Sequence, residues 1–208
     1  MNKTVELVKL WGEFESQNPG GTLDEFFRHQ LSLKIKAEKQ DTPGWQLHPG
    51  INGQLMILIR RIGKYHMVYS NKALEGSGLD QIEEFGILVT IFNHVNLIKS
   101  EAIFDNLMEL SSGTNMLTRL KRRGLISEYA DKEDKRVKRL KLTAKGEETL
   151  VNAKMRVLQA AQLMMDSLND EDKQLCLQLL TPVGDRFSGL FQKQRNKTFD
   201  EIFVEMVG

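Results

Sequence analysis

The sequence has almost no cysteine and no long hydrophobic run. Its 208 residues include a single cysteine, Cys176, which excludes an intramolecular disulfide and any cysteine-rich metal cluster. We expect Cys176 to be a small buried apolar residue. The longest apolar run, Leu55 to Ile59, is far too short to cross a bilayer, and acids stand near the N-terminus where a signal peptide would be apolar. These absences favour a cytoplasmic protein with no membrane partner.

Motifs that carry catalysis or bind cofactors are absent as well. The sequence has no phosphate-cradling glycine loop, no nucleophile elbow and no HExxH. Its histidines are not spaced as metal ligands, and structural roles are the expected ones for His29, His48, His66 and His94. We therefore predict no enzyme, no cofactor and no metal site.

Positive charge is concentrated in one part of the chain. The whole chain carries only +1, whereas the segment from Arg119 to Lys145 has eleven Lys and Arg against four acids, a local charge of +7. An isolated charge run is usually a solvated face. This one spans a helical pattern and the pattern of a hairpin, which is the footprint expected of a surface that neutralises phosphates.

The segment from Leu110 to Arg123 predicts an amphipathic helix. Ser111 and Ser112 are suited to capping its N-terminus, and Gly124 ends it. Its apolar residues share one face at helical spacing, and its polar and basic residues share the other. The apolar face carries Met116, Leu117 and Leu120, and the polar face carries Asn115, Thr118, Arg119 and Arg122.

A β-hairpin is predicted directly after this helix. Residues 126–130 have strand character, residues 131–136 form a charged loop, and apolar and polar side chains alternate over residues 137–143. A new helix is expected to start at Thr143. Helix, glycine, basic hairpin and helix in this order predict a winged helix-turn-helix in a mainly α-helical fold.

At these residues the sequence resembles the MarR family of bacterial transcriptional regulators. The resemblance rests on a T-x3-R/L-x3-GLI pattern around Thr114 to Ile126. A second pattern, D-x2-D-x-R-x3-L-x-LT-x2-G, runs from Asp131 to Gly146. The resemblance covers roughly Ile51 to the C-terminus. It implies a homodimer that binds an inverted-repeat operator in double-stranded DNA, more often as a repressor, with an affinity that a small ligand changes.

The expected DNA contacts come from the helix and the tip of the wing. Asn suits adenine and Arg suits guanine, so Asn115, Thr118 and Arg119 are expected to read base edges in the major groove. Asp134 can hold the guanidinium of Arg136, which at a wing tip is placed to enter a narrow minor groove. The full predicted set is Ser112, Thr114, Asn115, Thr118, Arg119, Arg122, Asp134, Lys135, Arg136 and Lys138.

Helices are predicted on both sides of this lobe. Upstream helices are expected over residues 4–16, 22 to about 39, 51 to about 75, 80–94 and 99–110, with a Pro- and Gly-containing linker over 40–50. Phe85, Leu88, Val89 and Phe92 are expected to be buried. Downstream, helices are expected over residues 144–168 and 170–194, with Pro182 kinking the last helix or ending its first half.

We divide the chain into four segments. They are an N-terminal helical extension (1–48), a first core helix (49–78), the winged helix-turn-helix (79–146) and a C-terminal helical dimerisation region (147–208). By analogy with the family, Tyr65, His66, Tyr69 and His94 are candidates to line an effector pocket, and structural roles are the alternative explanation. One alternative function is left open, a winged-helix module that binds an acidic protein partner instead of DNA.

Overall fold

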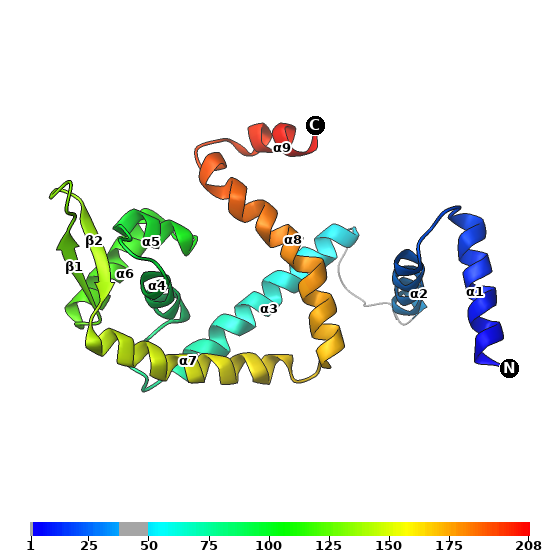
Figure 1. Cartoon of the computed structure of the whole chain (residues 1–208), viewed down its shortest axis with the longest axis horizontal. Coiled ribbons are helices and arrows are strands. Elements are labelled where there is room, and N and C mark those ends of the chain that lie inside the picture. Colours follow the sequence, from blue (N-terminus) through cyan, green and yellow to red (C-terminus); the bar gives the residue numbers. More distant parts are fainter. Residues whose placement is uncertain (1, 38–49) are drawn as a thin grey trace, which may run out of the picture. The chain divides into compact units, whose positions relative to one another are not determined.

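The computed structural model describes residues 2–37 and 50–208, which form two compact units, residues 1–52 and residues 53–208 (Figure 1). The predicted fold class is confirmed, because the described chain is mainly α-helical with one two-stranded antiparallel sheet. The elements are α1 (Lys3–Gln17), α2 (Leu23–Ala37), α3 (Ile51–Leu74), α4 (Ile82–Asn93), α5 (Lys99–Asp105), α6 (Leu110–Arg122), β1 (Ile126–Ala130), β2 (Lys138–Leu142), α7 (Ala144–Met165), α8 (Asp170–Gln194) and α9 (Phe199–Val207).

The first unit is a pair of helices around an aromatic cluster. The ring of Trp11 lies 5.9 Å from Phe14 and 5.3 Å from Phe26, and the last two rings are buried. A capping box starts α2, because Thr22 and Glu25 each accept a hydrogen bond from the backbone N–H of the other. The predicted end of α2 near residue 39 and the linker over 40–49 lie outside the described residues.

The segment boundaries proposed from the sequence stay predictions. The one between residues 48 and 49 lies outside the described part of the chain. The α3 helix spans the predicted range and ends where Gly76 and Gly78 adopt φ values of +77° and +91°, a left-handed backbone that favours glycine. No helix among residues 2–37 and 50–208 is long and apolar enough to cross a membrane.

One hydrophobic core holds the middle of the second unit together. Its buried side chains come from α4, α5, α6, both strands and α7, with Leu74 and Leu79 from the end of α3 and the following turn. The face that α4 buries differs from the predicted one. Leu88 is buried as expected, and Phe85 and Val89 are partly buried, but Phe92 is 63% exposed. The buried stripe instead follows Glu84, Ile87, Leu88 and Ile91 at helical spacing.

The turn between α5 and α6 comes earlier than predicted. The α5 helix ends at Asp105 because Asn106 folds back, donating from Nδ2 to the Ala102 carbonyl (2.8 Å) and to Thr90 Oγ1 (2.9 Å). Leu107 then takes a left-handed conformation with φ of 54°. The α6 helix starts at Leu110 after Glu109, so Ser111 and Ser112 lie inside its first turn and do not cap it.

The hairpin is as predicted. Strands β1 and β2 pair antiparallel, with Ile126 opposite Leu142, and the alternation of β2 buries Leu140 and Leu142. Gly124 ends α6 with a φ of +73°. The Thr143 side chain caps α7 by accepting from the Gly146 N–H at 3.0 Å, which confirms the predicted helix start.

The C-terminal helices hold two corrections. The α8 helix continues through Pro182 to Gln194, so the proline does not end its first half, and the alternative of a kink stays a prediction. Cys176 on this helix is exposed, not buried. A further helix, α9, follows α8 and was not predicted, although Thr198 and Glu201 form a capping box at its start.

Candidate nucleic-acid interface

The α6 helix separates its apolar and polar residues into two faces. Gly113, Met116, Leu117 and Leu120 are buried against the core. The residues predicted to contact DNA lie on the other side of the helix. Ser112, Thr114, Asn115, Thr118 and Arg122 are exposed, and Arg119 is partly buried.

The exposed face of α6 offers polar groups of two kinds. Thr114 and Thr118 each donate their hydroxyl to the carbonyl one turn earlier, at 2.7 and 2.8 Å, so their oxygens can still accept. Asn115 and Arg122 make no side-chain hydrogen bond or ion pair with the described residues, so their donors are available to a partner. Side chains of this kind can bind base edges or phosphates.

Asp131 organises the loop between the two strands. Its Oδ1 accepts the backbone N–H of Glu133 at 2.8 Å and of Asp134 at 3.0 Å, and its Oδ2 accepts from Arg139 Nε. The Asp134 N–H and the Arg139 guanidinium lower the pKa of Asp131 to about 2. Arg139 also donates to the Asn96 carbonyl, so this arginine holds the base of the wing.

Asp134 and Arg136 form the predicted pair at the wing tip. Arg136 donates from Nε to Asp134 Oδ1 at 3.1 Å and from Nη2 to Oδ2 at 3.0 Å, a bidentate arrangement. The Arg136 side chain is nevertheless 91% exposed. The bonded guanidinium lowers the pKa of Asp134. The pair therefore fixes the direction of a cation that stands in solvent.

Ion pairing sorts the basic residues of this region into two sets. Glu128 binds Lys99 at 2.9 Å and Lys121 at 3.1 Å, which neutralises part of the charge beside the wing. Other cations of the helix and wing form no ion pair with the described residues. They are Arg122, Lys132, Lys135, Lys138 and Lys141, all exposed, and Lys141 lies over the ring of Tyr129. Lys132 was counted in the basic segment but not singled out from the sequence.

The hairpin loop and α6 line one hollow. Its volume is about 420 Å³, and it is lined by Arg136, Val137 and Lys138 of the wing together with Leu110 and Thr114 of α6. The start of α5 closes its remaining side. Arg136, Lys138 and Thr114, from the two predicted DNA-contacting elements, therefore border a single depression.

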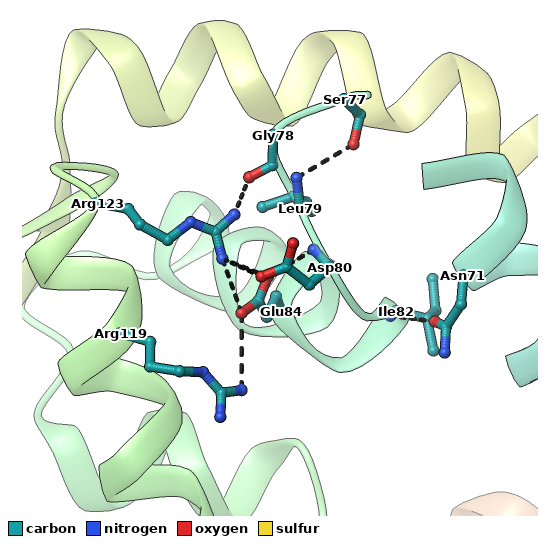
Figure 2. Close-up of polar contacts among 9 residues, drawn as sticks. All are labelled: Asn71, Ser77, Gly78, Leu79, Asp80, Ile82, Glu84, Arg119 and Arg123. Atoms are coloured by element: carbon teal, nitrogen blue, oxygen red, sulfur yellow. Dashed lines mark hydrogen bonds and ion pairs between the residues drawn. The ribbon is translucent and has the colours of Figure 1, made fainter. Parts of the chain in front are cut away.

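A carboxylate that the sequence reading missed lies behind α6. Glu84 on α4 is fully buried, and its oxygens accept from Nη1 of Arg123 at 3.0 and 2.9 Å (Figure 2). Arg119 Nη2 lies 3.7 Å from Glu84 Oε1. The sequence could have indicated this carboxylate, because Glu84 shares one helical face with Ile87 and Leu88. A buried acid on such a face requires a positively charged or hydrogen-bonding partner.

The residues suggested for an effector pocket are spread over two helices. Tyr65, His66 and Tyr69 lie along α3, where both tyrosines are exposed, and His94 caps the C-terminus of α4. Their role in ligand binding stays a prediction. Among the described residues, no group of three or more His, Cys, Asp and Glu is arranged to hold a metal ion.

Comparison with known proteins gives the fold. The sequence matches no protein-family model and no curated protein. The structure is similar to that of AbsC, a MarR family transcriptional regulator from Streptomyces coelicolor, with a TM-score of 0.60 and 18% identity over 70% of this chain and 99% of that one. Apo wild-type MarR from E. coli has a TM-score of 0.57 and 22% identity, over 66% of this chain and 98% of that one. CouR from Rhodococcus jostii RHA1, bound to p-coumaroyl-CoA, has a TM-score of 0.54 and 21% identity, over 62% of this chain and 90% of that one. This chain therefore has the fold of the MarR family of transcriptional regulators.

Proposed function

We propose that this protein is a sequence-specific DNA-binding transcriptional regulator that acts as a homodimer in the cytoplasm. One observation carries the proposal. The exposed face of α6 and the wing tip present polar and cationic side chains that the described residues leave unpaired, or that a carboxylate holds out into solvent. Such a surface can neutralise DNA phosphates with its cations and bind base edges with its polar side chains.

The two elements would divide the work of recognition. Asn115, Thr118 and Arg119 would meet base edges in the major groove, where Asn pairs with adenine and Arg with guanine. Arg136 would enter the adjoining minor groove, which attracts cations most where it is narrow. The remaining predicted contacts would bind phosphates and set the position of the protein on the duplex, and these are Ser112, Thr114, Arg122, Lys135 and Lys138.

Exposed apolar side chains support the dimer. The α3 helix exposes Leu55, Met56 and Ile59 among others, and α8 exposes Leu177, Val183 and Phe187. Apolar surface of this extent on helices of one unit favours burial against another subunit. A twofold dimer would present two recognition helices, so its operator would be an inverted repeat with half-sites about one helical turn apart.

Repression and ligand control complete the proposal. MarR-family regulators more often repress, and the similar protein CouR was solved bound to p-coumaroyl-CoA. We extend both properties to this protein, with a small-molecule effector that changes its affinity for DNA. Tyr65, His66, Tyr69 and His94 are the candidate contacts of that effector.

Selection from random duplex DNA tests the function most directly. The protein should enrich one inverted-repeat sequence, and its affinity should fall about 10³- to 10⁵-fold between roughly 50 and 200 mM salt if a dimer meets about six to ten phosphates. Failure to enrich any sequence, together with a flat salt response, would reject the proposal. Binding to an acidic protein in place of duplex DNA would then favour an interaction module.

A further inference from the structure

Glu84 is a charged residue at a position where the fold calls for an apolar one. It lies on the buried stripe of α4 and is fully buried, with Ile87 and Leu88 beside it. Burying a carboxylate is costly unless ionic and hydrogen-bonding partners compensate it. Those partners come from outside α4, which makes Glu84 a junction between separate elements of the fold.

Arg123 satisfies most of this carboxylate. Its Nη1 donates to both Glu84 oxygens and to Asp80 Oδ2, the last at 3.1 Å, and its Nη2 donates to the Gly78 carbonyl (Figure 2). The Asp80 backbone N–H adds a bond to Glu84 Oε2 at 2.9 Å. The end of the recognition helix is therefore fastened to the turn between α3 and α4.

Arg119 lies near the same carboxylate but is held differently. Its Nη2 is 3.7 Å from Glu84 Oε1, within ion-pair range but beyond hydrogen-bond length, and its side chain is 43% exposed. Arg119 precedes Arg123 by one helical turn, so the two guanidinium groups reach Glu84 from neighbouring turns of α6. Glu84 attracts the Arg119 guanidinium without occupying its donors, and these remain available to a base.

We propose that Glu84 is a positioning residue for DNA recognition, which orients Arg119 before DNA arrives. This inference rests on the proposed function. An arginine side chain loses much rotamer freedom when it makes a bidentate base contact, and a fixed charge behind it removes part of that loss in advance. The carboxylate is required because the amide of a glutamine would still accept from Arg123 but would attract Arg119 far less.

A double-mutant cycle on sequence discrimination tests the proposal. The measured quantity is the ratio of affinities for the selected operator and for a scrambled duplex, at one fixed salt concentration. Arg119→Ala should lower this ratio about 5- to 150-fold for each half-site, the loss of one bidentate base contact per protomer. Glu84→Gln alone should lower the affinity ratio by a smaller factor of about 3 to 10. When Arg119→Ala is already present, adding Glu84→Gln should change the ratio less than about twofold.

Glu83→Gln is the matched control, because Glu83 is the neighbouring acid on α4 and forms no hydrogen bond or ion pair with either arginine. It should leave the ratio unchanged. Glu84→Gln should also leave the salt dependence of binding unchanged, since Glu84 touches no group that faces phosphate. Independent, additive effects of Glu84→Gln and Arg119→Ala, or equal effects of the two glutamine variants, would overturn the inference.

A measurement on the wild-type protein covers the case in which Glu84→Gln fails to fold. The side-chain Nε–H signal of Arg119, assigned from its absence in Arg119→Ala, should show restricted motion in the free protein, whereas that of unpaired Arg122 should average freely. Equal mobility of the two would overturn the inference. If the Arg119 side chain has restricted motion but the wild-type protein prefers no DNA sequence, the proposed function has failed. If the wild-type protein prefers its operator but the double-mutant cycle shows no coupling between Glu84 and Arg119, only this inference has failed.

Discussion

Replacing Arg136 by alanine isolates the contribution of the wing to DNA binding. The substitution removes an exposed guanidinium and leaves the Asp134 carboxylate without its bidentate partner. Each wing thus loses one positive charge at its tip. Binding should weaken on every duplex, and most on sites with a narrow A/T-rich minor groove.

The magnitude follows from the number of available cations. Apart from Lys141, which lies over the ring of Tyr129, each protomer presents five exposed cations on the helix and wing that are unpaired or held into solvent, namely Arg122, Lys132, Lys135, Arg136 and Lys138. A dimer presents about ten, so the slope of log K against log salt can reach about −9, at about 0.9 for each phosphate neutralised. Arg136→Ala removes two of these cations and should reduce the slope by about 1.8. Between roughly 50 and 200 mM salt, the wild type should therefore lose about tenfold more affinity than the variant.

The assay is a titration of operator and scrambled duplex by fluorescence anisotropy at several salt concentrations. Arg136→Lys keeps the charge but not the planar fork, so it should keep the slope and lose the preference for a narrow groove. Arg156→Ala removes an exposed arginine of α7 outside the interface and should change neither quantity. A folded Arg136→Ala variant with the wild-type slope and affinity would refute the assignment of the wing.

Three further outcomes test the fold and the assembly. Gly146→Ala should lower the free energy of unfolding in urea by about 1–3 kcal/mol or more, because the added Cβ would lie 1.9 Å from the Leu125 carbonyl oxygen. The control Gly12→Ala adds a Cβ that meets nothing within 4 Å, so it should not destabilise the protein. Equal losses of unfolding free energy in the two variants would contradict the packing at Gly146. Asp131 should titrate with a pKa of about 2 in the folded protein, against an ordinary value of 3.8. Its contribution to the free energy of unfolding is therefore present above pH 4 and is lost as the pH falls toward 2. A carboxyl carbon of Asp131 that titrates near 3.8 in NMR would contradict the wing-loop geometry. Sedimentation equilibrium should give a dimer at micromolar concentration, weakened but not abolished by removal of residues 1–48, and a monomeric full-length chain would reject the dimer.

The sequence predicted best those elements whose pattern is local. Alternation over residues 137–143 identified the second strand, and the helix start at Thr143 was also predicted. The Asp134–Arg136 pair could also be predicted, because two residues of separation place both groups at one turn. Each of these features depends on neighbours within a few residues.

Features that depend on distant contacts were not predicted. Phe92 was expected to be buried with Phe85, Leu88 and Val89, but the elements packed on α4 bury Ile87 and Ile91 instead. The early end of α5 depends on a bond from Asn106 to Thr90, sixteen residues away. Glu84 acquires its role only when the fold brings the end of α6 beside it.

The closeness of α5 and α6 has a consequence for how this surface can change during evolution. A Cβ on Gly113 would meet the buried side chain of Ile103 at 2.5 Å, so a larger residue there would displace the helix. Asn115, Thr118 and Arg122, a few residues away, contribute nothing to the core and can be exchanged at little cost in stability. A saturation library of α6 should therefore contain folded members with many different outward faces and almost none altered at Gly113, so that new operator preferences can arise by substitution without compensating changes elsewhere.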